Sequence, residues 1–228
     1  MPHIGCITVC VRFDDYLEHT LARYVETFDA VAVVTTPEDE ATQALCARFP
    51  SVQVVRSTRA RDRGEAFNLP ALINDGYRAL APTAWAVKMD PDILLPANAR
   101  QVMDAALDDP ELLWGSRRYF CETIEIMDRF VATGDYGVLE PPYETTADVL
   151  GFLQLFHVAS SAMRGRDAPY EEARFEGPSR TNDRLFSERW GDRRRWLDFD
   201  VVHLGLDAIG TNWKGRKAPS FRRGAAPG

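Results

Sequence analysis

The sequence predicts an α/β protein with a central, mostly parallel mixed sheet. Short apolar, β-branched runs alternate with stretches of helical periodicity through the first half of the chain. The run that precedes Asp90 has the character of a strand buried in a parallel sheet. This alternation predicts right-handed β-α-β units, and 228 residues of 45% hydrophobic composition suffice for one such domain.

The first half follows this pattern element by element. Asp14 or Asp15 can cap the first helix, and Asn68 can cap the third, whose first turn tolerates Pro70. A polar loop at 57–65 precedes that third helix. In chain order we expect a strand at 3–12, a helix to Phe28, a strand at 30–35, a helix at 38–48, a strand at 52–55, a helix from Asn68 to about Leu80, and a strand from Ala84 into Asp90-Pro91-Asp92.

The second half is less regular. A loop at 134–147 contains two glycines and two prolines and is long enough to indicate a function. The last segment, 207–228, is rich in glycine and arginine. We expect helices at 98–107, 123–132 and 182–190, strands at 112–120, 150–158 and 196–204, and a polar loop at 171–180.

Two carboxylates end the apolar run at Asp90-Pro91-Asp92. Pro91 biases Asp90 toward an extended conformation, in which residues i and i+2 face the same side. Both carboxylates would then lie beyond the carboxyl end of a strand, where open α/β sheets place their ligands. Two hard oxygen ligands suit Mg²⁺ or Mn²⁺, especially an ion shared with a phosphate. The alternative is a surface turn built from three common turn formers.

Composition excludes several other classes. The net charge of −7 argues against a general nucleic-acid-coating protein. No apolar run approaches the roughly 20 residues of a membrane-spanning helix, and the first residues do not have the pattern of a secretion signal. The four cysteines lack metal-binding spacing, so we expect buried reduced thiols and a cytoplasmic protein. Neither a GxGxxG motif nor a P-loop follows the first strand, which argues against dinucleotide and Walker-type sites.

Several motifs, taken in order, resemble those of GT-A-fold glycosyltransferases, most closely the family 2 type. The similarity spans residues 3–216, although Asn182 stands where the family more often has an acid. The motifs are Arg63-Gly64-Glu65-Ala66-Phe67-Asn68, Lys88-Met89-Asp90-Pro91-Asp92, Gly151-Phe152-Leu153-Gln154-Leu155-Phe156, Thr181-Asn182-Asp183-Arg184-Leu185-Phe186, and His203-Leu204-Gly205 with Asn212-Trp213-Lys214-Gly215-Arg216.

This resemblance implies one GT-A-like domain over 1–216. Its Rossmann-like half, 1–96, would bind the nucleotide sugar, and 97–216 would form the acceptor side, followed by a basic tail at 217–228. The implied reaction is metal-dependent, inverting transfer of a sugar from a nucleotide diphosphate sugar, with UDP-sugars the first candidates. Asp92, Asp90 and His203 would hold Mn²⁺ or Mg²⁺. Asp183 would be the general base, and its alternative role is that of a first-turn acid of a helix.

A further set of residues would contact the nucleotide sugar. Thr35, Thr36 and Asp39 follow the second strand, near the switch point of the sheet, and their alternative role is to cap a helix. Arg63 suits a diphosphate because its planar fork binds two oxygens; as an alternative it is a solvated loop residue. The remaining candidates are Asn68 for the diphosphate or ribose, Asp90 for the ribose, the metal or both, Gln154 for the sugar or for a hydrogen bond in the core, and Lys214 and Arg216 for the diphosphate.

Two other functions remain open on the sequence. A nucleotidyltransferase has a similar α/β half but normally shows a glycine- and lysine-rich loop after the first strand, where this chain has Phe13-Asp14-Asp15. A non-catalytic binding module could keep the same fold. The acceptor is expected to be a saccharide or glycan hydroxyl, with DNA carrying hydroxylated bases as a further option.

Overall fold

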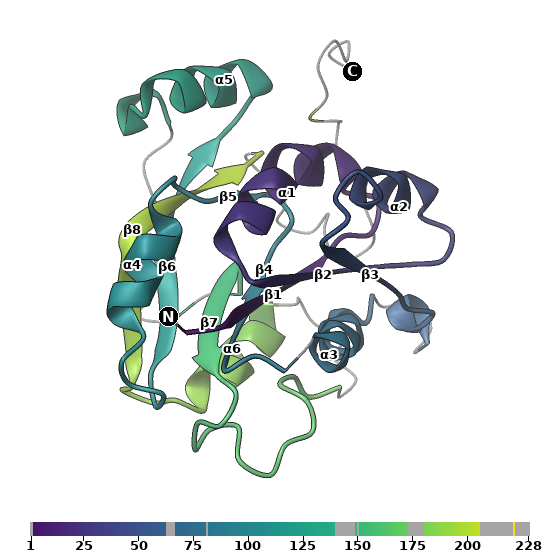
Figure 1. The fold of residues 1–228 in the computed structure, drawn as a ribbon, viewed down its shortest axis with the longest axis vertical. Coiled ribbons are helices and arrows are strands. Elements are labelled where there is room, and N and C mark those ends of the chain that lie inside the picture. The colour runs from purple at the N-terminus through teal and green to yellow at the C-terminus, as the bar shows by residue number, and fades with distance from the viewer. Residues whose placement is uncertain are drawn as a thin grey trace.

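An eight-stranded mixed sheet forms the centre of the computed structural model, in the order β3-β2-β1-β4-β7-β6-β8-β5 (Figure 1). The structure describes residues 2–62, 67–80, 82–139, 149, 151–172, 180–205 and 221. The strands are β1 (Ile4–Val9), β2 (Ala30–Thr35), β3 (Val52–Arg56), β4 (Trp85–Met89), β5 (Ile93–Leu94), β6 (Leu113–Cys121), β7 (Leu153–His157) and β8 (Arg194–Leu204). The helices are α1 (Asp14–Thr27), α2 (Glu40–Cys46), α3 (Leu69–Ala79), α4 (Ala99–Ala106), α5 (Ile124–Thr133) and α6 (Arg180–Glu188), with short 3₁₀ helices η1 (Arg59–Arg61) and η2 (Tyr136–Val138).

Strand direction brings most strand ends to one edge of the sheet. Strands β1 to β4 pair in parallel, as the sequence predicts. Strand β7 is antiparallel to both β4 and β6, and β8 pairs in parallel with β6. The carboxyl ends of β1, β2, β3, β4, β6 and β8 therefore share one edge with the start of β7. We call this edge the carboxyl edge.

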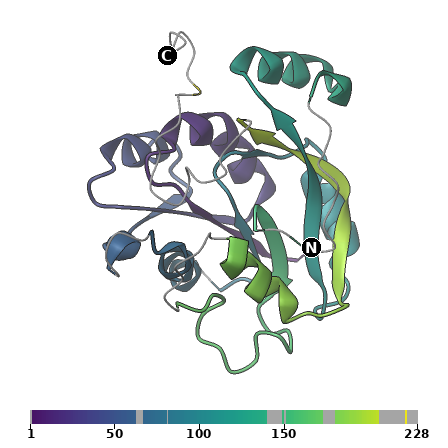
Figure 2. The same cartoon turned by 180° about the vertical axis from the view of Figure 1, so that it is seen from behind.

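Helices cover both faces of the sheet, and each face has its own apolar core. One core lies between the sheet and α1, α2 and α4, with Leu17, Leu21 and Met103 fully buried. The other lies between the sheet and α3 and α6, where Leu72 and Phe186 are buried. Figures 1 and 2 show α1 and α3 on opposite sides of β1 and β2. This is the two-sided covering that parallel strands need.

The predicted helix caps are partly confirmed. The Asn68 side chain accepts a hydrogen bond from the Ala71 amide at 3.3 Å and begins α3. Asp39 caps α2 in the same way. The prediction that Asp14 or Asp15 caps α1 is wrong, because the cap position is Phe13 and both acids lie inside the first turn.

Phe221, assigned from sequence to a basic tail, is buried against α1. Its ring stacks on Tyr16 with centroids 5.2 Å apart, and its amide donates to Asp15 Oδ2 at 2.9 Å. The packed domain therefore includes Phe221, five residues beyond the boundary expected at 216. The four cysteines are buried and form no disulfide. Within the described ranges, no helix is long and apolar enough to cross a bilayer.

Candidate active site

The Asp90-Pro91-Asp92 turn is fixed to α1 through its backbone carbonyls. The Tyr24 hydroxyl lies 2.8 Å from the Asp90 oxygen and 2.7 Å from the Ile93 oxygen. The Thr20 hydroxyl donates to the Pro91 oxygen at 2.7 Å. Since Thr20 and Tyr24 are fully buried residues of a packed helix, the turn is held rigidly and its two carboxylates have fixed directions.

Asp92 and His203 meet on one side of this turn. Asp92 is 2% exposed, and its Oδ2 lies 3.6 Å from His203 Nε2. The backbone oxygen of Asp92 accepts a hydrogen bond from the Leu204 amide at 2.8 Å, which joins the start of β5 to the end of β8. Burial raises the pKa of Asp92, and the nearby His203 offsets part of that rise. The Asp92 Oδ1 atom is buried without a hydrogen-bond partner, an arrangement that is costly unless a ligand completes it.

Lys88 lies on the other side, buried in β4. Its ammonium is 2.6 Å from Asp90 Oδ1 and 4.0 Å from Asp183 Oδ1, and it donates to the Gly151 carbonyl. Burial alone would lower the pKa of Lys88, but the charges of Asp90 and Asp183 outweigh this and raise it. Lys88 is therefore a permanent internal cation, a role that the sequence did not reveal because both Gly151 and Asp183 are distant along the chain.

Asp183 faces the same edge from the first turn of α6. Its carboxylate lies on the backbone of Gly151, where a Cβ would come within 1.8 Å of Asp183 Cγ. The Oδ1 atom is buried and has no hydrogen-bond partner. Burial raises the pKa of Asp183 to about 6, with Lys88 lowering it and Asp90 raising it. A carboxylate with this pKa can accept a proton near neutral pH.

The expectation that Asp90 and Asp92 face the same side does not hold. The chain turns at Pro91 and Asp92 instead of continuing extended. Asp90 binds Lys88, whereas Asp92 faces His203. In the described part of the chain, no group of three or more acidic, histidine or cysteine side chains converges as a metal cage would require. Of the predicted metal ligands, only Asp92 and His203 are therefore brought into contact.

Gln154 is a core residue, which corrects its assignment as a sugar contact. It is fully buried in β7. Its amide nitrogen donates to the backbone oxygens of Val149 and Asp183, each at 3.1 Å, and its oxygen accepts from the Tyr170 hydroxyl. Gln154 thus holds the start of α6 against the sheet and acts on the site through the position of Asp183.

The residues after β2 that were predicted to contact the nucleotide sugar form a network of hydrogen bonds within the fold. Asp39 Oδ2 accepts from the Arg12 amide at 2.7 Å and from the hydroxyls of Thr35 and Thr42 at 2.9 and 2.8 Å. Thr35 and Asp39 are buried, and Thr36 is half-buried beside them. These contacts favour the capping alternative for Thr35 and Asp39, which tie the turn after β1 to the start of α2.

The other predicted donor-binding residues divide into two groups. Asn68 uses its oxygen for the helix cap, and its nitrogen donates to Asp62 Oδ1 at 2.7 Å, so its side chain is fully engaged within the fold. Arg63, Lys214 and Arg216 lie outside the described residues.

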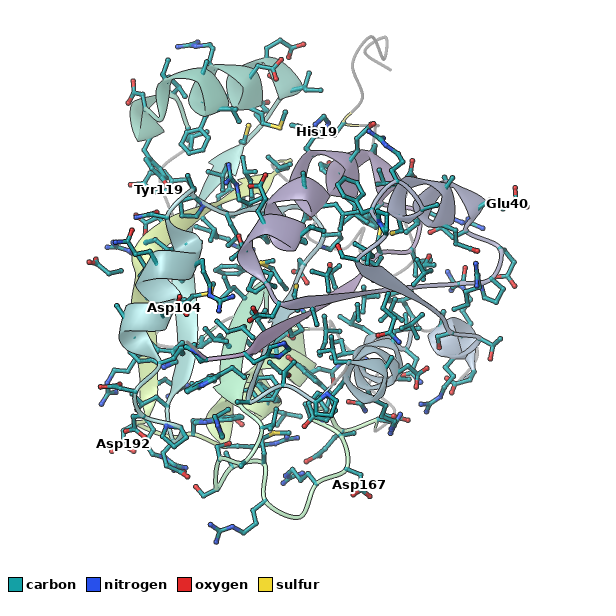
Figure 3. The ribbon with its side chains drawn as sticks, in the orientation of Figure 1. His19, Glu40, Asp104, Tyr119, Asp167 and Asp192 are labelled. Atoms are coloured by element: carbon teal, nitrogen blue, oxygen red, sulfur yellow. The ribbon has the colours of Figure 1, made fainter. Side chains whose placement is uncertain are left out.

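Arg118 also lies at the carboxyl edge, and it was not among the site residues predicted from the sequence. It lies near the carboxyl end of β6, with its guanidinium carbon 4.8 Å from the Phe120 ring centroid and 4.5 Å from that of Phe152. Figure 3 labels its neighbour Tyr119 well above Asp192, which precedes β8. In 113–121 the two arginines are adjacent, and nothing in their spacing distinguished Arg118 from Arg117.

No protein-family model matches the sequence, and no curated protein matches it significantly. Among solved structures, glucosyl-3-phosphoglycerate synthase from Mycobacterium tuberculosis in complex with Mg²⁺ and UDP matches over 90% of this chain and 73% of that chain, with a TM-score of 0.54 and 9% identity. The same enzyme with Mn²⁺, UDP and glucosyl-3-phosphoglycerate matches over the same shares, at 0.52 and 10%.

The chain has a GT-A-like fold. A 4-diphosphocytidyl-2C-methyl-D-erythritol synthase also matches, at 18% identity and 91% of each chain, but its TM-score of 0.46 is too low to carry an argument. The GT-A-like fold accounts for the two halves of the sheet, with parallel β1 to β4 on one side and the mixed β7, β6 and β8 on the other. The unpartnered carboxylate oxygens lie where these halves meet.

The contact between Gly151 and Asp183 yields a stability prediction. Gly151→Ala places a Cβ inside the Asp183 carboxylate and should destabilise the fold by about 1–3 kcal/mol, the usual cost of overpacking. In an Asp183→Ala background that space is empty, so the same substitution should cost much less. Urea unfolding of the wild type, both single variants and the double variant measures this coupling. Equal costs in the two backgrounds would show that Asp183 does not lie on Gly151.

Proposed function

We propose that this protein is a metal-dependent glycosyltransferase that moves a sugar from a nucleotide diphosphate sugar to an acceptor hydroxyl. One observation carries the proposal: two buried carboxylates at the carboxyl edge, Asp92 and Asp183, each keep an oxygen without a hydrogen-bond partner among the described residues. Leaving such atoms unpaired costs about 1–3 kcal/mol each. A fold retains that cost most readily where substrates complete the site.

Asp92 and His203 would hold the metal ion. The pair fits a divalent cation, because Asp92 offers a buried oxygen with no partner and His203 an imidazole 3.6 Å away. Bound there, Mn²⁺ or Mg²⁺ would neutralise the leaving diphosphate. Asp90 keeps a third of its side chain exposed while bound to Lys88, so it remains available to a ribose or to the ion. UDP is the first candidate nucleotide because the structural neighbours were solved with UDP and Mg²⁺ or Mn²⁺.

Asp183 would act as the base in an inverting displacement. The Asp183 carboxylate would take the proton of the acceptor hydroxyl while the hydroxyl oxygen forms the new bond to the anomeric carbon. The bond from that carbon to the diphosphate breaks at the same time, and the diphosphate leaves with the electron pair. Lys88 keeps Asp183 mostly ionised near neutral pH by opposing the effect of burial on its pKa.

A saccharide or other small hydroxyl compound is favoured over DNA as acceptor. The basic run Arg193-Arg194-Arg195 precedes or begins β8, at the opposite edge of the sheet from Asp183. Arg193 is also engaged by Glu111 at 2.6 Å. This run therefore offers no basic track leading to the candidate site.

Removal of the metal ligand should abolish metal-dependent nucleotide binding. At 100 times its dissociation constant, UDP with Mn²⁺ should stabilise the wild type by about 2.7 kcal/mol. Asp92→Ala should remove this stabilisation, whereas Asp167→Ala, at an exposed position far from the edge (Figure 3), should keep it. Thermal unfolding with UDP, GDP, CDP and TDP, each with and without Mn²⁺, measures the effect. A wild type with no metal-dependent shift for any of them would contradict the proposal.

Removal of the base should separate binding from chemistry. Asp183→Asn should keep the metal-dependent UDP shift yet lower sugar transfer by roughly 10²–10⁴-fold. Because the ionised carboxylate is the active form, wild-type transfer should rise with pH through about 6 and then level off. Transfer or donor hydrolysis measured between pH 4.5 and 8.5 tests both points. Normal transfer by Asp183→Asn, or wild-type transfer that does not rise with pH near 6, would exclude Asp183 as the base.

A further inference from the structure

Arg118 is a half-buried cation at the carboxyl edge, and it makes no ion pair with any residue that the structure describes. Among the described residues its side chain contacts the rings of Phe120 and Phe152, and no carboxylate lies within 4.0 Å of its guanidinium. Its neighbour Arg117, in contrast, binds Asp200 at 2.8 Å on the exposed side of β6. Two adjacent arginines of one strand therefore have different roles.

The two rings fix the guanidinium while leaving its hydrogen-bond donors free. A cation over an aromatic ring is attracted by the ring's charge distribution and needs no N–H···O bond, so these two contacts use none of the guanidinium's hydrogen-bond donors. Phe120 is itself held against His203, with ring centroids 5.2 Å apart. Burial lowers the pKa of Arg118, and the charges of Asp90 and Asp92 offset part of that effect, which places it near both carboxylates without a direct pair.

Arg118 and Asp183 flank the same two residues at the start of β7. Asp183 lies on Gly151, and Arg118 lies on the ring of Phe152. A hydroxyl that gives its proton to Asp183 must sit against Gly151, so the rest of the acceptor is within reach of the Phe152 ring. A planar fork with five donors at that point suits a phosphate or a carboxylate.

We propose that Arg118 binds an anionic group of the acceptor, a phosphate or a carboxylate, so that the substrate is a small hydroxyl compound bearing a negative charge. This inference rests on the proposed glycosyltransferase function. It assigns to Arg118 a role in choosing the acceptor, whereas Asp92 and His203 serve the donor side.

Binding of inorganic phosphate to the full chain tests the assignment. Calorimetric titration of phosphate is done in the presence of Mg²⁺ and saturating UDP, and again without UDP. Arg118→Met should weaken phosphate binding about tenfold or more, and Arg118→Lys should weaken it less because it keeps the charge but loses the fork. Arg117→Met is the matched control and should bind phosphate as the wild type does. UDP affinity should stay within about twofold in all three variants.

Three results would overturn the assignment. The first is a wild type that does not bind phosphate in either titration. The second is an Arg117→Met variant that loses as much phosphate affinity as Arg118→Met. The third is an Arg118→Met variant that loses UDP affinity by the same factor as phosphate affinity, which would assign the guanidinium to the donor diphosphate. If Arg118→Met does not fold, Arg118→Lys decides. Failure of UDP to bind the wild type with metal would instead refute the proposed function, and the titration without UDP would still report on Arg118.

Discussion

The buried ammonium of Lys88 is the interaction on which the carboxyl edge depends. It joins Asp90 at the end of β4, the Gly151 carbonyl before β7, and Asp183 on α6. These groups come from three separate elements, and two of them carry like charges, of which Asp183 is buried and Asp90 partly exposed. Without a cation between them, one carboxylate would take up a proton or the elements would separate. Removing one partner of a buried ion pair typically costs about 3–5 kcal/mol, so this contact also holds the two halves of the fold together.

Lys88 also divides the edge into two parts with different chemistry. Asp90 is drawn toward Lys88, which leaves Asp92 to face His203 on the side of α1. Asp183 stays on the side of α6, with its pKa raised to about 6 by burial. One side therefore offers an oxygen and an imidazole suited to a cation, and the other offers a carboxylate able to take up a proton. In the proposed function, leaving-group stabilisation and proton removal would therefore be separated in space, as a direct displacement requires.

Local sequence signals predicted the fold well because they depend on neighbouring residues. The strand at 30–35 and the Asn68 cap follow from β-branched runs and side-chain capping alone. The site residues that were missed or reassigned depend on strand pairing. The role of Lys88 depends on the pairing of β7 with β4, which local sequence does not show. The sequence made Gln154 a candidate sugar contact, whereas in the structure it hydrogen-bonds to Tyr170 and to the backbone of Asp183 in α6. Arg118 is positioned in part by the ring of Phe152, which lies just before β7 and is distant from Arg118 in sequence.

The most direct test of this account is an experimental structure of the protein with Mn²⁺ and UDP. The account predicts the ion bound to Asp92 with the diphosphate beside it, and Lys88 still joining Asp90, Gly151 and Asp183. A structure with the ion and nucleotide away from the carboxyl edge, or with Lys88 turned away from both carboxylates, would contradict it.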